Sequence, residues 1–195
     1  MDIKILQTSL KYIFEKHKLK NEKKHSYLGV FTIKSFNNLN LTNIKNACLI
    51  LFIDYINEKL GHFVSIFKIN NKLIWVDSYG KSVSFYKKNI TNKYISFTYY
   101  LSKKIQSNIS TSCGAYCVFF IHMILKCDYD LNKYAKIILK EFPETKKFIE
   151  NDKKIVSYII RNTNISSKNC KKYFCNNSFI IKYNECLQSV CDVWQ

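Results

Sequence analysis

The stretch of residues 106 to 125, QSNISTSCGAYCVFFIHMIL, constrains the fold more than any other part of the chain. Its residues 113 to 124 are almost entirely apolar, and such a run is typical of a buried helix. The three residues Ser110 to Ser112 precede the run, and serine and threonine often cap helix N-termini. We therefore expect a buried helix that begins at Cys113.

A thiol at the first position of a helix has unusual chemistry. The helix dipole favours an anion there and lowers the pKa of a cysteine, so Cys113 is the candidate nucleophile. Cys117 lies within the apolar run and Cys127 shortly after it, and both are expected to be inert packing residues. Gln106, seven residues before Cys113, is an uncharged donor that could point at a developing oxyanion. A nucleophilic cysteine also needs a base, and the chain offers four histidines.

Composition sets the broad class of the protein. The 195 residues, 47% of them hydrophobic and 15% aromatic, suffice for one domain with a substantial core. The 31 basic and 14 acidic residues give a net charge of +17, which attracts nucleic acid or acidic surfaces. We find no apolar run typical of a signal peptide or membrane span. We therefore expect a soluble intracellular protein without a membrane partner, and its eight cysteines to be mostly thiols.

A β-hairpin is predicted to bring a histidine and an acid together. Two β-rich runs, HFVSIFKI and KLIWVD, are separated only by Asn70 and Asn71, and a two-residue Asn turn favours a hairpin. His62 opens the first run and Asp77 closes the second, so both lie at the same end of the hairpin. The carboxylate could then orient the imidazole and stabilise its charged form, as the third group of a catalytic triad does.

Hydrophobic periodicity predicts the remaining elements. They are an amphipathic helix over residues 3–16, a buried strand over 46–53, a loop over 78–89, a β-rich run over 94–101, and two surface helices over 131–142 and 144–162, broken by Pro143. We interpret His122 as a satisfied core histidine and Trp75 as a core residue.

The chain order His62, Asp77, Gln106, Cys113 resembles that of the adenovirus-type cysteine proteases, the adenain family, whose relatives include deconjugases of ubiquitin-like proteins. The matching motifs are His62-Phe63, Val76-Asp77-Ser78-Tyr79-Gly80, the seven-residue spacing of Gln106 and Cys113, the Cys-Gly helix from Cys113 to His122, and Tyr27-Leu28-Gly29-Val30-Phe31. The resemblance runs from about residue 5 to about residue 165.

The resemblance implies both a fold and an activity. With the predicted elements, it leads us to expect an α+β fold, in which a central mixed sheet packs against a buried helix that starts at the catalytic cysteine, with peripheral helices. It implies an endopeptidase with catalytic residues His62, Asp77, Gln106 and Cys113 that processes viral or mobile-element precursor proteins, in the virion and at assembly sites inside the host cell. It also implies that DNA and a peptide activator could stimulate the enzyme, although no cofactor is required for the chemistry. We expect a monomer.

The chain departs from the adenoviral pattern at three places. Phe63 stands where the family usually has tryptophan, and the acid is Asp77 rather than glutamate; both changes preserve the chemistry. The adenoviral enzymes form a disulfide with their peptide activator through a cysteine between the acid and the nucleophile, and this chain has none between residues 78 and 112. That mode of activation is not carried over.

The chain after residue 167 forms a cysteine-rich tail. We therefore expect a protease domain over residues 1–167 and a tail over 168–195, which contains four cysteines at C-x4-C spacing: Cys170, Cys175, Cys186 and Cys191. These thiols could hold zinc or form disulfides, but x4 is a looser spacing than a usual zinc knuckle. Our first expectation is therefore ordinary free thiols, with no metal.

Two other functions fit the same sequence. One is a deconjugase of ubiquitin-like modifiers that uses the same four residues. The other is a basic nucleic-acid-binding module without catalysis, in which Cys113 would be no more reactive than Cys48 or Cys127.

Overall fold

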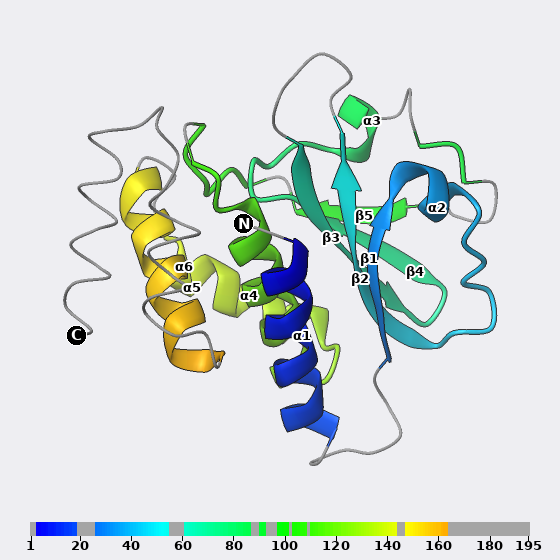
Figure 1. The fold of residues 1–195 in the computed structure, drawn as a ribbon, viewed down its shortest axis with the longest axis horizontal. Coiled ribbons are helices and arrows are strands. Elements are labelled where there is room, and N and C mark those ends of the chain that lie inside the picture. The colour runs from blue at the N-terminus through cyan, green and yellow to red at the C-terminus, as the bar shows by residue number, and fades with distance from the viewer. Residues whose placement is uncertain are drawn as a thin grey trace.

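The structure is a computed structural model, and it describes residues 3–18, 26–54, 61–86, 90–92, 97–101, 103–108, 110–143 and 147–163. Figure 1 shows its helices and strands. They are, in chain order, α1 (Ile3–Lys18), β1 (Ser26–Thr32), α2 (Ile33–Asn37), β2 (Asn46–Ile53), β3 (His62–Ile69), β4 (Lys72–Val76), α3 (Val83–Tyr86), β5 (Phe97–Leu101), α4 (Cys113–Lys126), α5 (Leu131–Glu141) and α6 (Phe148–Asn162).

The strands of the described residues form one five-stranded mixed sheet in the order β1-β2-β3-β4-β5. The two central pairings, β2 with β3 and β3 with β4, are antiparallel, whereas the outer strands β1 and β5 pair in parallel with their neighbours. The α2 helix lies in the connection between β1 and β2, and α3 lies in that between β4 and β5. The expected α+β fold with a central mixed sheet is confirmed.

The hairpin of β3 and β4 has the predicted two-residue turn. Asn70 occupies the left-handed region at φ 52°, which asparagine tolerates better than most residues. The register pairs Ile69 with Lys72 next to the turn and Ser65 with Val76 at the far end. His62 and Asp77 therefore lie at the same end of the hairpin, as the sequence predicts.

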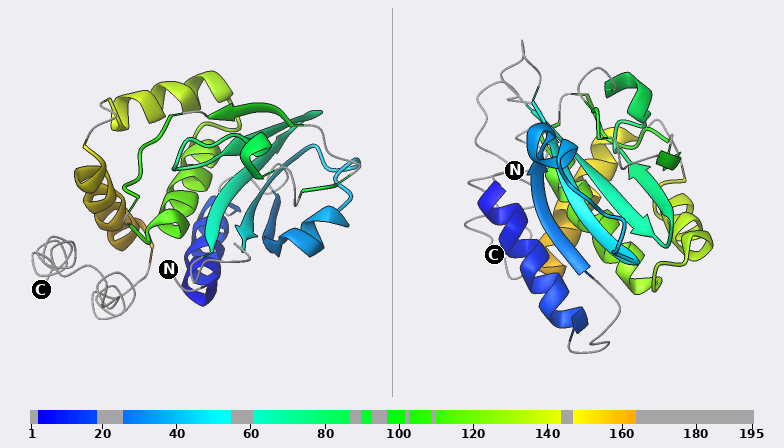
Figure 2. Two further views of the ribbon diagram at one scale, coloured as in Figure 1. Left: turned by 90° about the horizontal axis from the view of Figure 1, so that it is seen from above. Right: turned by 90° about the vertical axis from the view of Figure 1, so that its right-hand side faces the viewer.

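Both faces of the sheet are covered (Figures 1 and 2). On one face, a large core joins Cys48, Phe67 and Val76 of the sheet to residues of α1, α4, α5 and α6. On the other, a smaller core gathers around Trp75 and Phe36, the latter from α2. Burial on both faces explains why β2 is a continuous apolar run rather than an alternating one.

The α4 helix begins at Cys113, as predicted, and every residue from Cys113 to Leu125 is buried. It packs against β3, where the Ser65 hydroxyl donates a hydrogen bond to the Cys117 carbonyl at 3.5 Å. A helix enclosed on all sides has no solvent-facing positions that need polar side chains. The predicted amphipathic helices are also present, as α1, α5 and α6.

The prediction of a loop over residues 78–89 is wrong in part, because α3 forms one helical turn within it. The Tyr86 side chain is buried at the end of this turn and donates a hydrogen bond to Asp77. A contact with a residue nine positions earlier thus orders a segment whose own periodicity is too short to indicate a helix.

No helix in the described part of the chain is long and apolar enough to cross a membrane. The predicted boundary at residue 167 and the tail lie outside the described residues, which end at residue 163.

Candidate active site

His62 and Asp77 form a buried pair at one end of the hairpin. His62 Nε2 lies 2.8 Å from Asp77 Oδ1, and the two side chains are 2% and 0% exposed. The carboxylate has two further donors: the Tyr79 backbone N–H binds Oδ1 at 2.8 Å, and the Tyr86 hydroxyl binds Oδ2 at 2.9 Å. Three donors thus converge on one buried carboxylate, and its hydrogen bond with Nε2 fixes the orientation of the imidazole.

The imidazole of His62 is held on a second side by an aromatic ring. The Tyr79 ring stacks on it, with centroids 4.6 Å apart and planes 23° apart. Its other nitrogen, Nδ1, is buried and has no hydrogen-bond partner that meets normal distance limits among the described residues. Nδ1 is therefore the ring atom that remains available to Cys113, whose thiol is close enough to influence the charge of the ring.

The electrostatics of the site favour an ion pair between the histidine and the cysteine. Burial alone would lower the pKa of His62, but its hydrogen bond to the Asp77 carboxylate and the interaction with Cys113 raise it to about 9. Burial likewise opposes a Cys113 thiolate, but the nearby His62 imidazole with its charge and the backbone N–H of Phe63 hold the pKa of Cys113 below its ordinary value. This combination, a cysteine of lowered pKa beside a histidine of raised pKa, is what a thiolate nucleophile requires.

The N-terminus of α4 adds to this effect. Ser112 is the N-cap residue, but its side chain makes no capping hydrogen bond, and its own N–H binds the Ser110 hydroxyl at 3.1 Å. The predicted capping by a side chain at this position is therefore not made. The N–H groups of the first turn are not occupied by the Ser112 hydroxyl, and they add partial positive charge beside Cys113.

Gln106 is fully buried at the same end of α4. Its Nε2 donates to the Ser110 carbonyl at 2.9 Å and reaches the Tyr79 hydroxyl at 3.5 Å, while its Oε1 accepts from the Ser78 hydroxyl. One amide hydrogen is thus firmly bound, and the second makes only a long contact. The second hydrogen is thus the one that a stronger acceptor, such as an oxyanion, could take from the Tyr79 hydroxyl.

Protein-family models and curated protein sequences gave no match to this chain. Geometry and electrostatics are therefore the observations that bear on the role of these four residues.

The other described cysteines differ from Cys113. Cys48, Cys117 and Cys127 are buried and unbridged, and burial raises the pKa of each thiol above its ordinary value. His122 is buried, and its Nδ1 lies 2.6 Å from the Tyr158 hydroxyl. It is thus a satisfied core histidine as predicted, and Trp75 is fully buried as predicted.

The described residues contain no group of three or more histidine, cysteine or acidic side chains that could hold a metal ion. Cys170, Cys175, Cys186 and Cys191 lie outside the described part of the chain, so the prediction for the tail stays a prediction.

Of the two tyrosines that support the pair, the sequence predicts the place of one. The register of the hairpin predicts that Tyr79 lies beside His62, and the stacked rings confirm it, whereas Tyr86 lies in the segment predicted to be a loop. Nothing in the local pattern distinguishes Tyr86 from other tyrosines, because its contact with Asp77 depends on the helical turn of α3.

Proposed function

We propose that the protein is a cysteine endopeptidase of the adenain type, in which Cys113 is the nucleophile and His62 the base. The observation that supports this most strongly is the buried His62–Asp77 pair, which leaves the second imidazole nitrogen to the thiol at the start of α4. A solvent-exposed or unpaired histidine would not support the proposal.

The chemistry follows the order of the groups. His62 takes the proton of Cys113, and the thiolate attacks the carbonyl carbon of the scissile peptide bond. The Gln106 amide and the Cys113 backbone N–H hold the resulting oxyanion. The imidazolium then gives its proton to the leaving amine, and an acyl-enzyme remains. His62 next takes a proton from water, which attacks the thioester and releases the acid while the thiolate is regenerated.

The substrate class rests on the family resemblance. Viral or mobile-element precursor proteins, cut at small residues such as glycine during particle maturation, are the substrates that we propose. The net charge of +17 supports a further role for DNA, which would concentrate the enzyme on a genome inside an assembling particle.

Peptide hydrolysis tests the activity. We expect the wild type to cleave fluorogenic peptide amides that end in Gly-Gly, with or without added duplex DNA, and Cys113→Ala to have no turnover. Equal hydrolysis by both proteins would end the proposal. Faster cleavage of a ubiquitin-like protein with a C-terminal Gly-Gly reporter than of any precursor-derived peptide would instead favour a deconjugase.

A further inference from the structure

The buried face of α6 carries two polar residues where apolar ones are expected. The buried residues of this helix are Asn151, Asp152, Ile155, Val156 and Ile159, which form one continuous stripe. Asn151 is 7% exposed and Asp152 is 0% exposed. Burying an amide and a carboxylate is costly unless both have partners, so their contacts indicate why this stripe begins with polar side chains.

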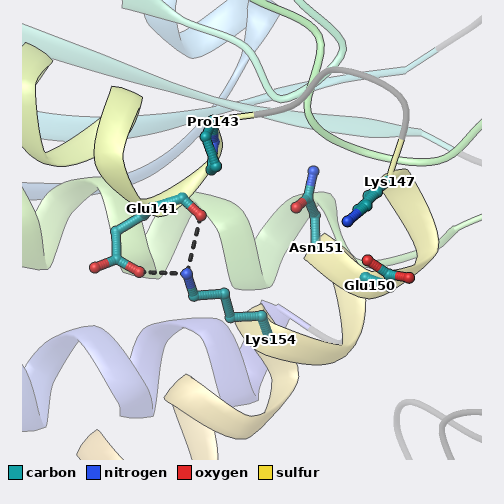
Figure 3. Close-up of a pocket in the computed structure, with 6 residues that line it drawn as sticks. All are labelled: Glu141, Pro143, Lys147, Glu150, Asn151 and Lys154. Atoms are coloured by element: carbon teal, nitrogen blue, oxygen red, sulfur yellow. Dashed lines mark hydrogen bonds and ion pairs between the residues drawn. The ribbon is translucent and has the colours of Figure 1, made fainter.

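Both side chains bind the backbone on either side of Gln106. Asn151 Nδ2 donates to the Ile105 carbonyl at 3.0 Å, and Asp152 Oδ2 accepts from the Ser107 N–H at 3.3 Å. The polar pair at the start of α6 thus holds the residue before Gln106 and the residue after it. Figure 3 shows Asn151 projecting from α6 beside Lys147 and Glu150, and these residues line a pocket to which none of the four candidate catalytic residues contributes.

Other parts of the chain also hold this short segment. The Ser78 carbonyl accepts hydrogen bonds from the N–H groups of both Ile105 and Gln106, at 2.9 and 3.0 Å. The Tyr116 hydroxyl of α4 donates to the Ile105 carbonyl at 3.1 Å. Segment 105–107 has no regular secondary structure of its own, so the contacts from α4, α6 and the turn after β4 set its position.

We infer that Asn151 and Asp152 are positioning residues of the active site, which hold the 105–107 segment so that the Gln106 amide lies where the oxyanion forms. This inference rests on the proposed function, because it assigns a role to Gln106 in the peptidase reaction. A displacement of about 1 Å in such a donor can cost about 100-fold in rate, so a clamp on both of its neighbours has a clear catalytic use.

The test compares Asn151→Ala with Asn162→Ala. Asn162 lies on the same helix, but its amide donates to the Tyr158 carbonyl of its own helix at 2.8 Å, so its loss is the matched control. We expect Asn151→Ala to lower kcat about 10- to 100-fold on the Gly-Gly peptide amide, and Asn162→Ala to leave it unchanged. The alkylation rate of Cys113 should stay the same in both, since alkylation involves no oxyanion.

A double-mutant cycle separates positioning from general damage to the fold. In a Gln106→Ala background, Asn151→Ala should lower kcat by less than about threefold, because the donor that it positions is already absent. If Asn151→Ala lowered kcat by the same factor in both backgrounds, the inference would be overturned. Full activity of Asn151→Ala in the otherwise wild-type protein would overturn it as well.

Asp152 gives a second test that does not depend on peptide hydrolysis. Asp152→Asn keeps an acceptor oxygen for the Ser107 N–H, whereas Asp152→Leu removes it at similar size. We expect faster hydrogen exchange in a peptide covering residues 103–110 for the leucine variant and near-normal exchange for the asparagine variant. Unchanged hydrogen exchange in the leucine variant would contradict the inference that Asp152 holds the 105–107 segment. If the wild type cleaved no peptide, the proposed function would fail, while this exchange measurement would still decide whether α6 holds the segment.

Discussion

At the scale of single residues, the site depends on how three donors surround one carboxylate. Asp77 receives His62 Nε2 and the Tyr79 N–H on one oxygen and the Tyr86 hydroxyl on the other. The first of these contacts could be predicted from the sequence, since a two-residue turn fixes the register of the hairpin. The contact with Tyr86 could not, because it depends on a helical turn that the periodicity of the segment does not indicate.

The Tyr86 hydroxyl should therefore contribute measurably to stability. Tyr86→Phe leaves one oxygen of a buried carboxylate without this donor, and we expect the free energy of unfolding to fall by about 1.5–3 kcal/mol, the range for hydrogen bonds to charged groups. Urea denaturation measures the change. Tyr12→Phe, at a tyrosine of α1 that is 39% exposed, is the control and should have little effect. A Tyr86 variant as stable as that control would contradict this role.

At the scale of elements, α4 contains two thiols of opposite character one turn apart. Cys113 lies at the helix N-terminus beside His62, whereas Cys117 lies inside the core, where burial raises its pKa well above the ordinary value. The apolar run and the residues before it were sufficient to predict both the start of the helix and the difference between the thiols. The pairing order of the five strands could not be predicted in the same way, because it is set by contacts between segments far apart in the chain.

Replacing the second thiol tests this difference. Cys117→Ala removes one buried sulfur and should lower the free energy of unfolding by about 1–2 kcal/mol, through a small cavity. Turnover of the peptide amide should persist, because Cys117 takes no part in the chemistry. Cys113→Ala, the same change one turn earlier, should abolish turnover. A Cys117→Ala protein that folds but has no activity would show that the two thiols act together.

At the scale of the whole molecule, a sheet covered on both faces supports a site built from distant parts of the chain. His62 and Asp77 come from the central hairpin, Cys113 from a helix on one face, and the clamp on Gln106 from a helix near the end of the described chain. The chain order of the four candidate residues was visible in the sequence, but the involvement of α6 was not. In the sequence, the only sign of a role for α6 is a pair of polar residues on an otherwise apolar helix stripe.

The net charge of +17 leads to a prediction for the molecule as a whole. Duplex DNA should bind at 50 mM salt, and affinity should fall about tenfold or more by 200 mM as condensed counterions are released. Fluorescence anisotropy of a labelled duplex measures this fall, and polyglutamate of equal charge serves as the control polyanion. An affinity that does not change with salt would rule out an electrostatic partnership with DNA.

The most direct test of the central claim is the pH dependence of alkylation at each cysteine, read by mass spectrometry in the wild type and in His62→Ala. The thiolate is the reacting species, so a lowered pKa moves the rise in rate to lower pH, and the imidazolium persists up to its own pKa of about 9. In the wild type we predict rapid modification of Cys113 at a pH clearly below that at which an ordinary thiol reacts, with Cys48, Cys117 and Cys127 protected. In His62→Ala the imidazolium no longer offsets the effect of burial on the Cys113 thiol. The pH at which its alkylation rate rises should therefore move above about 8.5. Uniform slow modification of all the cysteines, with no effect of His62→Ala, would contradict an activated nucleophile and favour a basic binding module.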